Sequence, residues 1–389
     1  MRTLYLDTET YSEVPISHGT YRYAASAEVM LCTYAFGDEP AGVIDATKIG
    51  RDKARALILE LVDAADIVKA HNAMFDRNVL RLGDMKITVP IRKWRCTMVK
   101  AMLHGLPGGL DKLCDILNIA ADKRKIADGR KLIHLFCKPQ PANRKIRRAT
   151  YLTHPAEWAR FVTYALGDIT AMRAIDAALP KWNYDELEAN TGGSRELELY
   201  WLDQEINDRG VPVDIELAES AVLACERSKD ALNESLSERT DGDVERATQR
   251  DKLMNYILLE YGIALTDLTK ATVTRLLDNP SSDPALLELL NIRQQASRTS
   301  TSKFKAFLRG VNDDNRLRGM FQFSGAARTR RDAGRTAQLQ NLPSRGLPPW
   351  ADILLAIEAT KAGCLDILVS DVTAMAMAMV RPVISTRSD

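Results

Sequence analysis

The sequence predicts an α/β domain with a mixed sheet, followed by a region that is almost entirely helical. Two observations support this prediction. Early in the chain, short apolar segments of strand length surround one amphipathic helical segment, which is the pattern of strand, hairpin, helix and strand. After residue 196, apolar side chains recur at helical spacing over several long segments. Between these regions, Tyr184 to Arg195 is polar and contains Gly192-Gly193-Ser194, which predicts a linker.

The first region begins with an apolar strand at Leu4 to Leu6, and Glu28 to Phe36 is apolar and aromatic enough to form a second strand. Asp52 to Ala65 carries an apolar stripe at helical spacing. The segments 19–25 and 120–150 predict loops, of which the second is basic and exposed. In order, we expect strands at 4–6, 28–36, 42–45, 66–70 and 94–96, a turn leading into a helix at 71–80, and helices at 52–65, 97–103, 110–117 and 154–178.

The second region contains one helical segment after another. The first of them is closed by Gly210, and the last is rich in Ala and Met. The methionines of that last segment, Met375, Met377 and Met379, predict either a docking face for further polypeptide or an ordinary helix core. We expect helices at 196–209, 215–239, 248–261, 270–277, 284–297 and 353–379.

Composition places the chain among ordinary globular proteins, with 46% hydrophobic residues. No apolar run approaches the roughly 20 residues that span a bilayer. The six cysteines are scattered without a C-x-x-C pair, which predicts reduced thiols in a core and a cytoplasmic location. The net charge of +1 does not indicate a partner, but twelve basic and three acidic residues lie between Arg293 and Arg345. Such a local excess predicts a surface for a polyanion, with a solvated charged surface as the alternative.

Four carboxylates lie where the predicted elements bring polar groups together. Asp7 and Glu9 are two residues apart on the first strand, so they face the same side. Asp76 follows a predicted turn, four residues after Asn72, whose amide is either an N-cap or a substrate contact. Converging carboxylates repel one another unless a cation lies between them, and oxygen ligands favour Mg²⁺ or Mn²⁺. The alternative for an isolated D-x-E is that Asp7 caps a turn and Glu9 is solvated. We interpret His71, which precedes Asn72, as a packing residue.

The fourth carboxylate, Asp168, lies one helical turn after Tyr164, so the phenol and the acid share a helix face. The ordered set D-x-E, N-x-x-x-D and Y-x-x-x-D resembles the three exonuclease motifs of the DEDD superfamily, tyrosine branch. Members are 3′–5′ proofreading exonucleases with a ribonuclease H-like fold. The resemblance implies two divalent ions about 3.5–4 Å apart that clamp the scissile phosphate. It assigns the metals to Asp7, Glu9, Asp76 and Asp168, the attacking water to Tyr164, and substrate contacts to Thr8 and Asn72.

Three further segments resemble family A DNA polymerases of the phage type. They are EINDRGVPVD from Glu205, ASRTSTSKFKAFL from Ala296 and FQFSGAARTRRDAGRTAQLQNLP from Phe321. The resemblance implies a mostly helical thumb and partial palm that bind primer–template DNA, through phosphates and minor-groove acceptors. A turn before Pro343 is the alternative reading of Gln340-Asn341. The residues assigned to primer–template contacts are Lys303, Arg328, Arg331, Gln340 and Asn341.

The sequence departs from the polymerase pattern in two ways. Arg330 stands where the family usually has glycine, and it either disturbs the turn or adds a phosphate contact. Asp371 imitates the first polymerising aspartate, but Ala376 stands where a glutamate is expected, so we interpret Asp371 as ordinary. The resemblance therefore implies a 3′–5′ exonuclease domain at 1–185, a template-binding region at 186–345 and a truncated polymerase segment at 346–389.

This resemblance predicts a DNA exonuclease in a bacterial or phage-infected cell, without a polymerising site in this chain. A second chain that completes a split polymerase is an open alternative. So are a polymerase fragment that binds DNA without cutting it and an exoribonuclease of the same superfamily.

Overall fold

The structure is a computed structural model that describes residues 1–120, 129–180, 195–279, 282–296 and 301–384. The chain divides into two compact units. The first comprises Met1–Gly210 and Leu317–Gln338, and the second comprises Val211–Arg316 and Leu339–Asp389. These units divide the chain at positions different from the predicted functional boundaries.

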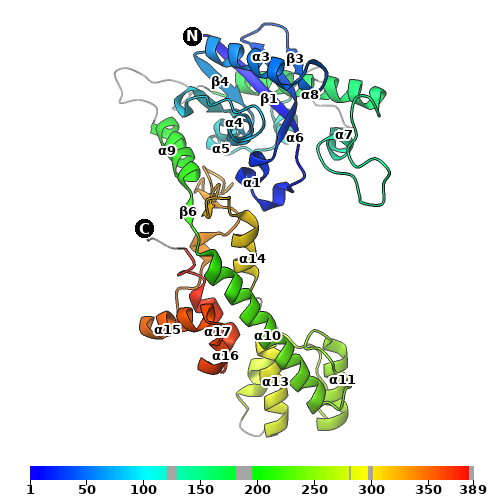
Figure 1. The fold of residues 1–389 in the computed structure, drawn as a ribbon, viewed down its shortest axis with the longest axis vertical. Helices are drawn as coiled ribbons and strands as arrows, with labels where there is room; N and C mark the ends of the chain where they lie inside the picture. The colour runs from blue at the N-terminus through cyan, green and yellow to red at the C-terminus, as the bar shows by residue number, and fades with distance from the viewer. Residues whose placement is uncertain (121–128, 181–194, 280–281, 297–300, 385–389) are drawn as a thin grey trace. The chain divides into compact units, whose positions relative to one another are not determined.

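A five-stranded mixed sheet forms the centre of the first unit, in the order β3-β2-β1-β4-β5 (Figure 1). The central strand β1 is antiparallel to β2 on one side and parallel to β4 on the other. The chain between β3 and β4 crosses from one side of β1 to the other. All five predicted strands are confirmed, and the first is longer than predicted. Their bounds are β1 (Thr3–Tyr11), β2 (Glu28–Phe36), β3 (Gly42–Asp45), β4 (Ile67–Ala70) and β5 (Trp94–Cys96).

Helices pack on both faces of β1. Leu4 and Leu6 join the core that contains α3 (Arg51–Ala64) and α4 (Ala73–Leu82), whereas Tyr5 packs with α8 (Pro155–Ala178). Because alternate residues of a strand face opposite sides, α4 and α8 cover opposite faces of β1. The other helices of this unit are α1 (Thr20–Ala25), α2 (Ala46–Ile49), α5 (Thr97–Leu103), α6 (Leu110–Ile116), α7 (Gly129–Phe136) and α9 (Arg195–Arg209), with short 3-10 turns at Ile16–His18 and Ile91–Lys93.

Two predicted loops of the first unit are wrong. The segment 19–25 forms α1, because Tyr21 and Tyr23 bury their rings in the unit. The basic segment 120–150 contains α7, whose Leu132 and Phe136 are one turn apart and buried. The predicted linker lies outside the described residues up to position 194.

The second unit is helical, as predicted, and is arranged along α10 (Ile215–Arg239). The predicted helix at 353–379 is divided into three, and Gly363 with φ +76° follows the first of them. The remaining helices are α11 (Arg250–Tyr261), α12 (Lys270–Leu277), α13 (Pro284–Ala296), α14 (Thr301–Gly310), α15 (Trp350–Lys361), α16 (Leu365–Leu368) and α17 (Val372–Met379).

Short strands and a 3-10 turn complete the described chain: β6 (Val211–Pro212), β7 (Arg316–Leu317), β8 (Phe321–Gln322), β9 (Ala333–Gly334) and Leu339–Asn341. All six cysteines are free thiols, and five are buried, which confirms the prediction that they are reduced core residues. Among the described helices, none has the length and apolar character needed to cross a bilayer.

Candidate active site

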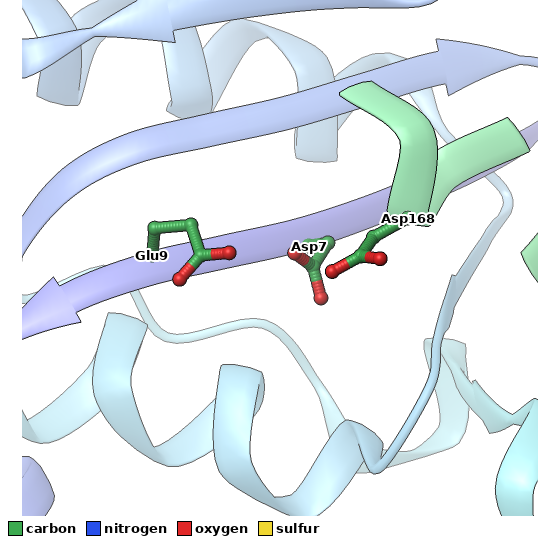
Figure 2. A group of neighbouring side chains, drawn as sticks. All are labelled: Asp7, Glu9 and Asp168. Carbon is green, nitrogen blue, oxygen red and sulfur yellow. The ribbon is translucent and has the colours of Figure 1, made fainter. Parts of the chain in front are cut away.

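Strand β1 and helix α8 bring three carboxylates together. Asp7 and Glu9 lie on the β1 face that α8 covers, and Asp168 reaches them from α8 (Figure 2). One oxygen from each of the three side chains lies within 4.8 Å of the others. Glu9 and Asp168 are buried, and Asp7 is half-buried. The prediction that Asp7 and Glu9 face the same side is therefore confirmed. The fold brings Asp168 to them, although it lies more than 150 residues later in the sequence.

Tyr164 lies one helical turn before Asp168 and is 1% exposed. Burial raises the pKa of its phenol, and the negative charges of Asp168 and Glu9 raise it further. Tyr164 is thus a neutral hydrogen-bond donor beside the acidic cluster at any ordinary pH.

Helix α7 fixes the ring of Tyr164. A Cβ at Gly129 would lie only 2.0 Å from Cε2 of that ring, so glycine is the residue that allows α7 this close. The rings of Phe161 and Tyr164 are nearly parallel, with centroids 6.3 Å apart. The described part of the segment predicted to be a loop therefore helps to build the site.

Asp76 lies in the first turn of α4, on the opposite face of β1 from α8. Its Oδ1 accepts hydrogen bonds from the N–H of Thr8 at 3.0 Å and from the Thr8 hydroxyl at 2.7 Å. Burial raises the pKa of Asp76 to about 7, although both bonds from Thr8 oppose the shift. Asp76 is not part of the group of three described above, but Thr8, the residue between Asp7 and Glu9, connects it to that group.

Asn72 and His71 precede α4. Asn72 has a left-handed backbone, with φ +73°, and its side chain makes no capping bond. The side-chain capping predicted as one alternative for Asn72 is therefore not observed, and its contact with substrate stays a prediction. The ring nitrogens of His71 lie 2.9 Å from the Thr97 hydroxyl and from the Gly108 carbonyl, which agrees with a structural role for this residue.

A cavity of about 600 Å³ opens beside Glu9. Its wall includes Thr8, Phe75 and Ile133, and also Cys137, whose thiol lies 3.8 Å from Glu9 Oε2. Burial raises the pKa of this thiol well above its usual value, and the charge of Glu9 adds to the effect. Sequence analysis does not predict Cys137 as a neighbour of the site, because the spacing of the cysteines carries no motif.

The residues predicted to contact primer–template DNA are divided between the two units. Arg328 and Arg331 are exposed in the first unit. Lys303 is half-buried on α14 in the second unit, where Gln340 and Asn341 are exposed in a 3-10 turn before Pro343. Their contacts with DNA stay predictions.

Both departures from the polymerase pattern have a structural explanation. Arg330 keeps the left-handed backbone that a glycine would adopt, with φ +55°, and its guanidinium donates to the carbonyl of Leu103 at the end of α5. Asp371 caps α17, where it accepts bonds from the Ala374 N–H and the Thr373 hydroxyl, each at 2.9 Å. These bonds agree with its interpretation as an ordinary residue, which stays a prediction.

The acidic cluster has the chemistry of a site for a hard divalent cation. All three ligand groups are carboxylates, which Mg²⁺ and Mn²⁺ prefer over softer donors. Three buried or half-buried anions this close are costly unless a positive charge offsets their repulsion. Asp7, Glu9 and Asp168 therefore fit such an ion.

No family model matches the chain. It is 35% identical over 349 residues to a DNA polymerase of Bacillus phage SP02, a match that covers 88% of this chain and 51% of that polymerase. The fold is similar to the polymerase domain of Pol1 from M. smegmatis, solved with DNA primer-template and dNTP. That similarity has a TM-score of 0.53 at 16% identity and covers 88% of this chain and 52% of the Pol1 chain.

This chain therefore spans about half the length of each of these two relatives. Its sequence match and its fold agree with the resemblance carried by the EINDRG and QLQNLP segments. By sequence and by fold, the chain is therefore similar to DNA polymerases over about half of their length.

Proposed function

We propose that this chain is a metal-dependent 3′–5′ DNA exonuclease of the proofreading type, whose first unit has a ribonuclease H-like fold. The observation that carries the proposal is the convergence of Asp7, Glu9 and Asp168 within 4.8 Å, beside the buried phenol of Tyr164. The strand order, with the antiparallel strands β1, β2 and β3 followed by β4 and β5 parallel to β1, supports the fold assignment.

In the proposed site, Asp7, Glu9 and Asp168 hold divalent cations, and Asp76 contributes from the α4 side through its position against Thr8. Bound divalent ions would activate a water and stabilise the leaving 3′-oxygen of the scissile phosphodiester. Tyr164, a neutral donor at working pH, orients the attacking water. The cavity beside Glu9 accepts the 3′-terminal nucleotide, with Phe75 and Ile133 on its apolar wall.

The second part of the proposal is that the chain holds primer–template DNA. The similarity to a phage DNA polymerase and the local excess of basic residues support it. Arg328, Arg331 and Lys303 would bind phosphates, and Gln340 and Asn341 would accept or donate bonds in the minor groove. Since Asp371 caps a helix, the proposal assigns no polymerising role to it.

The test uses a 5′-labelled DNA strand, Mg²⁺ and no nucleotides. The proposal predicts stepwise shortening that stops when EDTA is added and that Asp7→Ala abolishes. Asp371→Ala is the matched control, since it removes an acid that caps α17 outside the cluster, and it is expected to shorten DNA as the parent chain does. Duplex binding without metal-dependent cleavage would instead identify a non-catalytic DNA-binding chain, and faster cleavage of RNA would identify an exoribonuclease.

A further inference from the structure

The last turn of α9 carries a partly buried ion cluster that joins three helices of the first unit. Asp208 accepts hydrogen bonds from both terminal nitrogens of Arg77, at 2.7 and 2.8 Å, and from Arg81 at 2.7 Å. It also accepts a bond from the Tyr21 hydroxyl on α1 at 2.5 Å. Arg77 is 3% exposed, and the fork of its guanidinium matches both carboxylate oxygens.

This carboxylate is ionised in the folded protein. Burial alone would raise the pKa of Asp208, but the hydrogen bonds and the charge of Arg77 outweigh that effect and lower it. A partly buried charge with this many donors holds its partners in one geometry, because any displacement breaks charge-assisted hydrogen bonds to buried groups.

The partners of Asp208 lie on the helix that carries Asp76. Arg77 follows Asp76 directly, and Arg81 lies one turn later, so the two arginines share the α4 face that contacts α9. Asp76 itself bonds to Thr8 on β1. Polar contacts thus connect helix α4 to two different elements: Asp76 bonds to β1, and the two arginines bond to α9.

We propose that Asp208 is a positioning residue of the nuclease, which fixes the rotation of α4 so that the Asp76 carboxylate stays against Thr8 beside the acidic cluster. This inference rests on the proposed function, in which Asp76 is the fourth carboxylate of the site. It gives a role to an acid that lies in the EINDRG segment, far in sequence from every exonuclease motif.

The same turn of α9 also holds the segment 317–338. The Asn207 amide pairs with both the N–H and the carbonyl of Phe321, each at 3.0 Å, and Arg318 donates to the Asp208 carbonyl at 2.7 Å. The turn is therefore fixed from two sides, which gives Asp208 a stable position from which to hold α4.

The test is a double-mutant cycle of Mn²⁺ binding, measured by calorimetry on the full chain without DNA. Asp76→Asn and Asp208→Asn are each expected to weaken Mn²⁺ binding, the second by roughly tenfold, as for residues that orient metal ligands. In the Asp76→Asn background, Asp208→Asn is expected to have no further effect, because its influence passes through Asp76. Additive losses would overturn the inference, since they would show that Asp208 acts on the site without Asp76.

A matched control separates this effect from a general loss of stability. Asp84 lies just beyond α4 and accepts a bond from the Val29 N–H on β2 at 3.0 Å. Asp84→Asn is expected to keep the parental Mn²⁺ affinity. If Asp208→Asn does not fold, as judged by near-UV circular dichroism, Tyr21→Phe replaces it in the cycle, because it removes one donor to Asp208 and leaves both charges paired.

The cycle also distinguishes failure of this inference from failure of the proposed function. If the parent chain shortens no DNA with Mg²⁺, the proposed function is wrong, and the Mn²⁺ cycle still reports whether Asp208 acts through Asp76. If the parent chain shortens DNA and Asp208→Asn retains both the parental rate and the parental Mn²⁺ affinity, the positioning role is wrong.

Discussion

Lys100 is 2% exposed, and its ammonium donates to Asp176 Oδ1 at 2.9 Å. Lys69 and the Tyr5 hydroxyl bond to the other oxygen of Asp176, at 2.8 and 2.7 Å. Breaking one side of such a buried network leaves charge without compensation, so Lys100→Met is expected to cost about 2–4 kcal/mol of unfolding free energy in urea titrations. The control, Arg239→Gln, breaks an exposed pair with Glu288 and is expected to cost less than about 1 kcal/mol. Equal losses for the two variants would contradict this account of the Lys100 network.

Asp203 on α9 is buried and accepts bonds from Gln204 at 2.9 Å and Asn207 at 3.1 Å. Burial raises its pKa to about 7, whereas an unfolded aspartate titrates near about 4. The folded state therefore binds a proton that the unfolded state releases, and the stability from this group is lost as pH rises from about 4 through 7.

Asp203→Asn keeps a neutral acceptor at all pH values. It is expected to exceed the parent chain in unfolding free energy by roughly 1–3 kcal/mol at pH 8 and by much less at pH 5. Urea titrations at the two pH values measure the difference. A difference that does not change between pH 5 and pH 8 would show that Asp203 is already ionised in the folded protein.

Local spacing in the sequence predicts some neighbours of the candidate site and not others. The spacing of Asp7 with Glu9 and of Tyr164 with Asp168 predicts that each pair shares one face, because the period of a strand or a helix alone places them there. The sequence does not predict that Asp208 is a neighbour of α4, since its partners lie 127 and 131 residues away in sequence. Contacts of that kind depend on tertiary packing, which no local period encodes.

Among the elements, helices α7 and α8 offer a matched pair of glycines. A Cβ at Gly129 would meet the Tyr164 ring at 2.0 Å, whereas a Cβ at Gly167, next to Asp168, would meet no atom within 4 Å. Gly129→Ala is expected to displace Tyr164 and, on the proposed function, to lower the exonuclease rate at least tenfold. Gly167→Ala is expected to keep the rate and to raise the unfolding free energy by about 0.5–1 kcal/mol, as alanine favours the helix. Equal rates for both variants would show that the α7 contact does not position Tyr164.

At the same scale, the elements predicted best are those with a clear period. Strand β2 and helix α5 begin and end where the pattern places them. Both segments are mostly apolar, and a polar residue and a glycine follow each of them directly. The pattern predicts neither α1 nor α7, because α1 buries two tyrosines through distant contacts and α7 lies among basic residues that suggest solvent exposure. The burial of Phe136 against Phe161 and Trp158 comes from α8, which the local sequence does not report.

For the whole molecule, the first unit contains more than the predicted exonuclease region. Leu197 and Trp201 of α9, together with Phe323, belong to the same core as Leu4 and Leu6 of β1. A boundary at residue 185 separates functional motifs in the sequence, but the packing of the core does not follow it. Motifs reveal chemistry, whereas the extent of a compact unit depends on which distant segments bury their side chains together.

Binding of DNA by the whole chain is expected to depend on salt through the exposed arginines of the segment 317–338. If Arg331 contacts a phosphate, Arg331→Ala reduces the slope of log affinity against log salt by about 0.9. Arg239→Gln is the control, because Arg239 is paired with Glu288, and it is expected to leave the slope unchanged. Fluorescence anisotropy with duplex DNA over a salt series gives the slopes. An unchanged slope for Arg331→Ala would remove this residue from the proposed contacts.

The most direct test of the proposed active site is the fate of the terminal nucleotide. The same DNA strand is labelled at its 3′ end or at its 5′ end and digested by the full chain in Mg²⁺. The arrangement of Asp7, Glu9, Asp168 and Tyr164 predicts that the 3′ label leaves at once as a mononucleotide, while the 5′ label passes through a ladder of shortening strands. Asp168→Ala is expected to abolish both changes. Release of the 5′ label first, internal cuts, or undiminished release by Asp168→Ala would contradict the account.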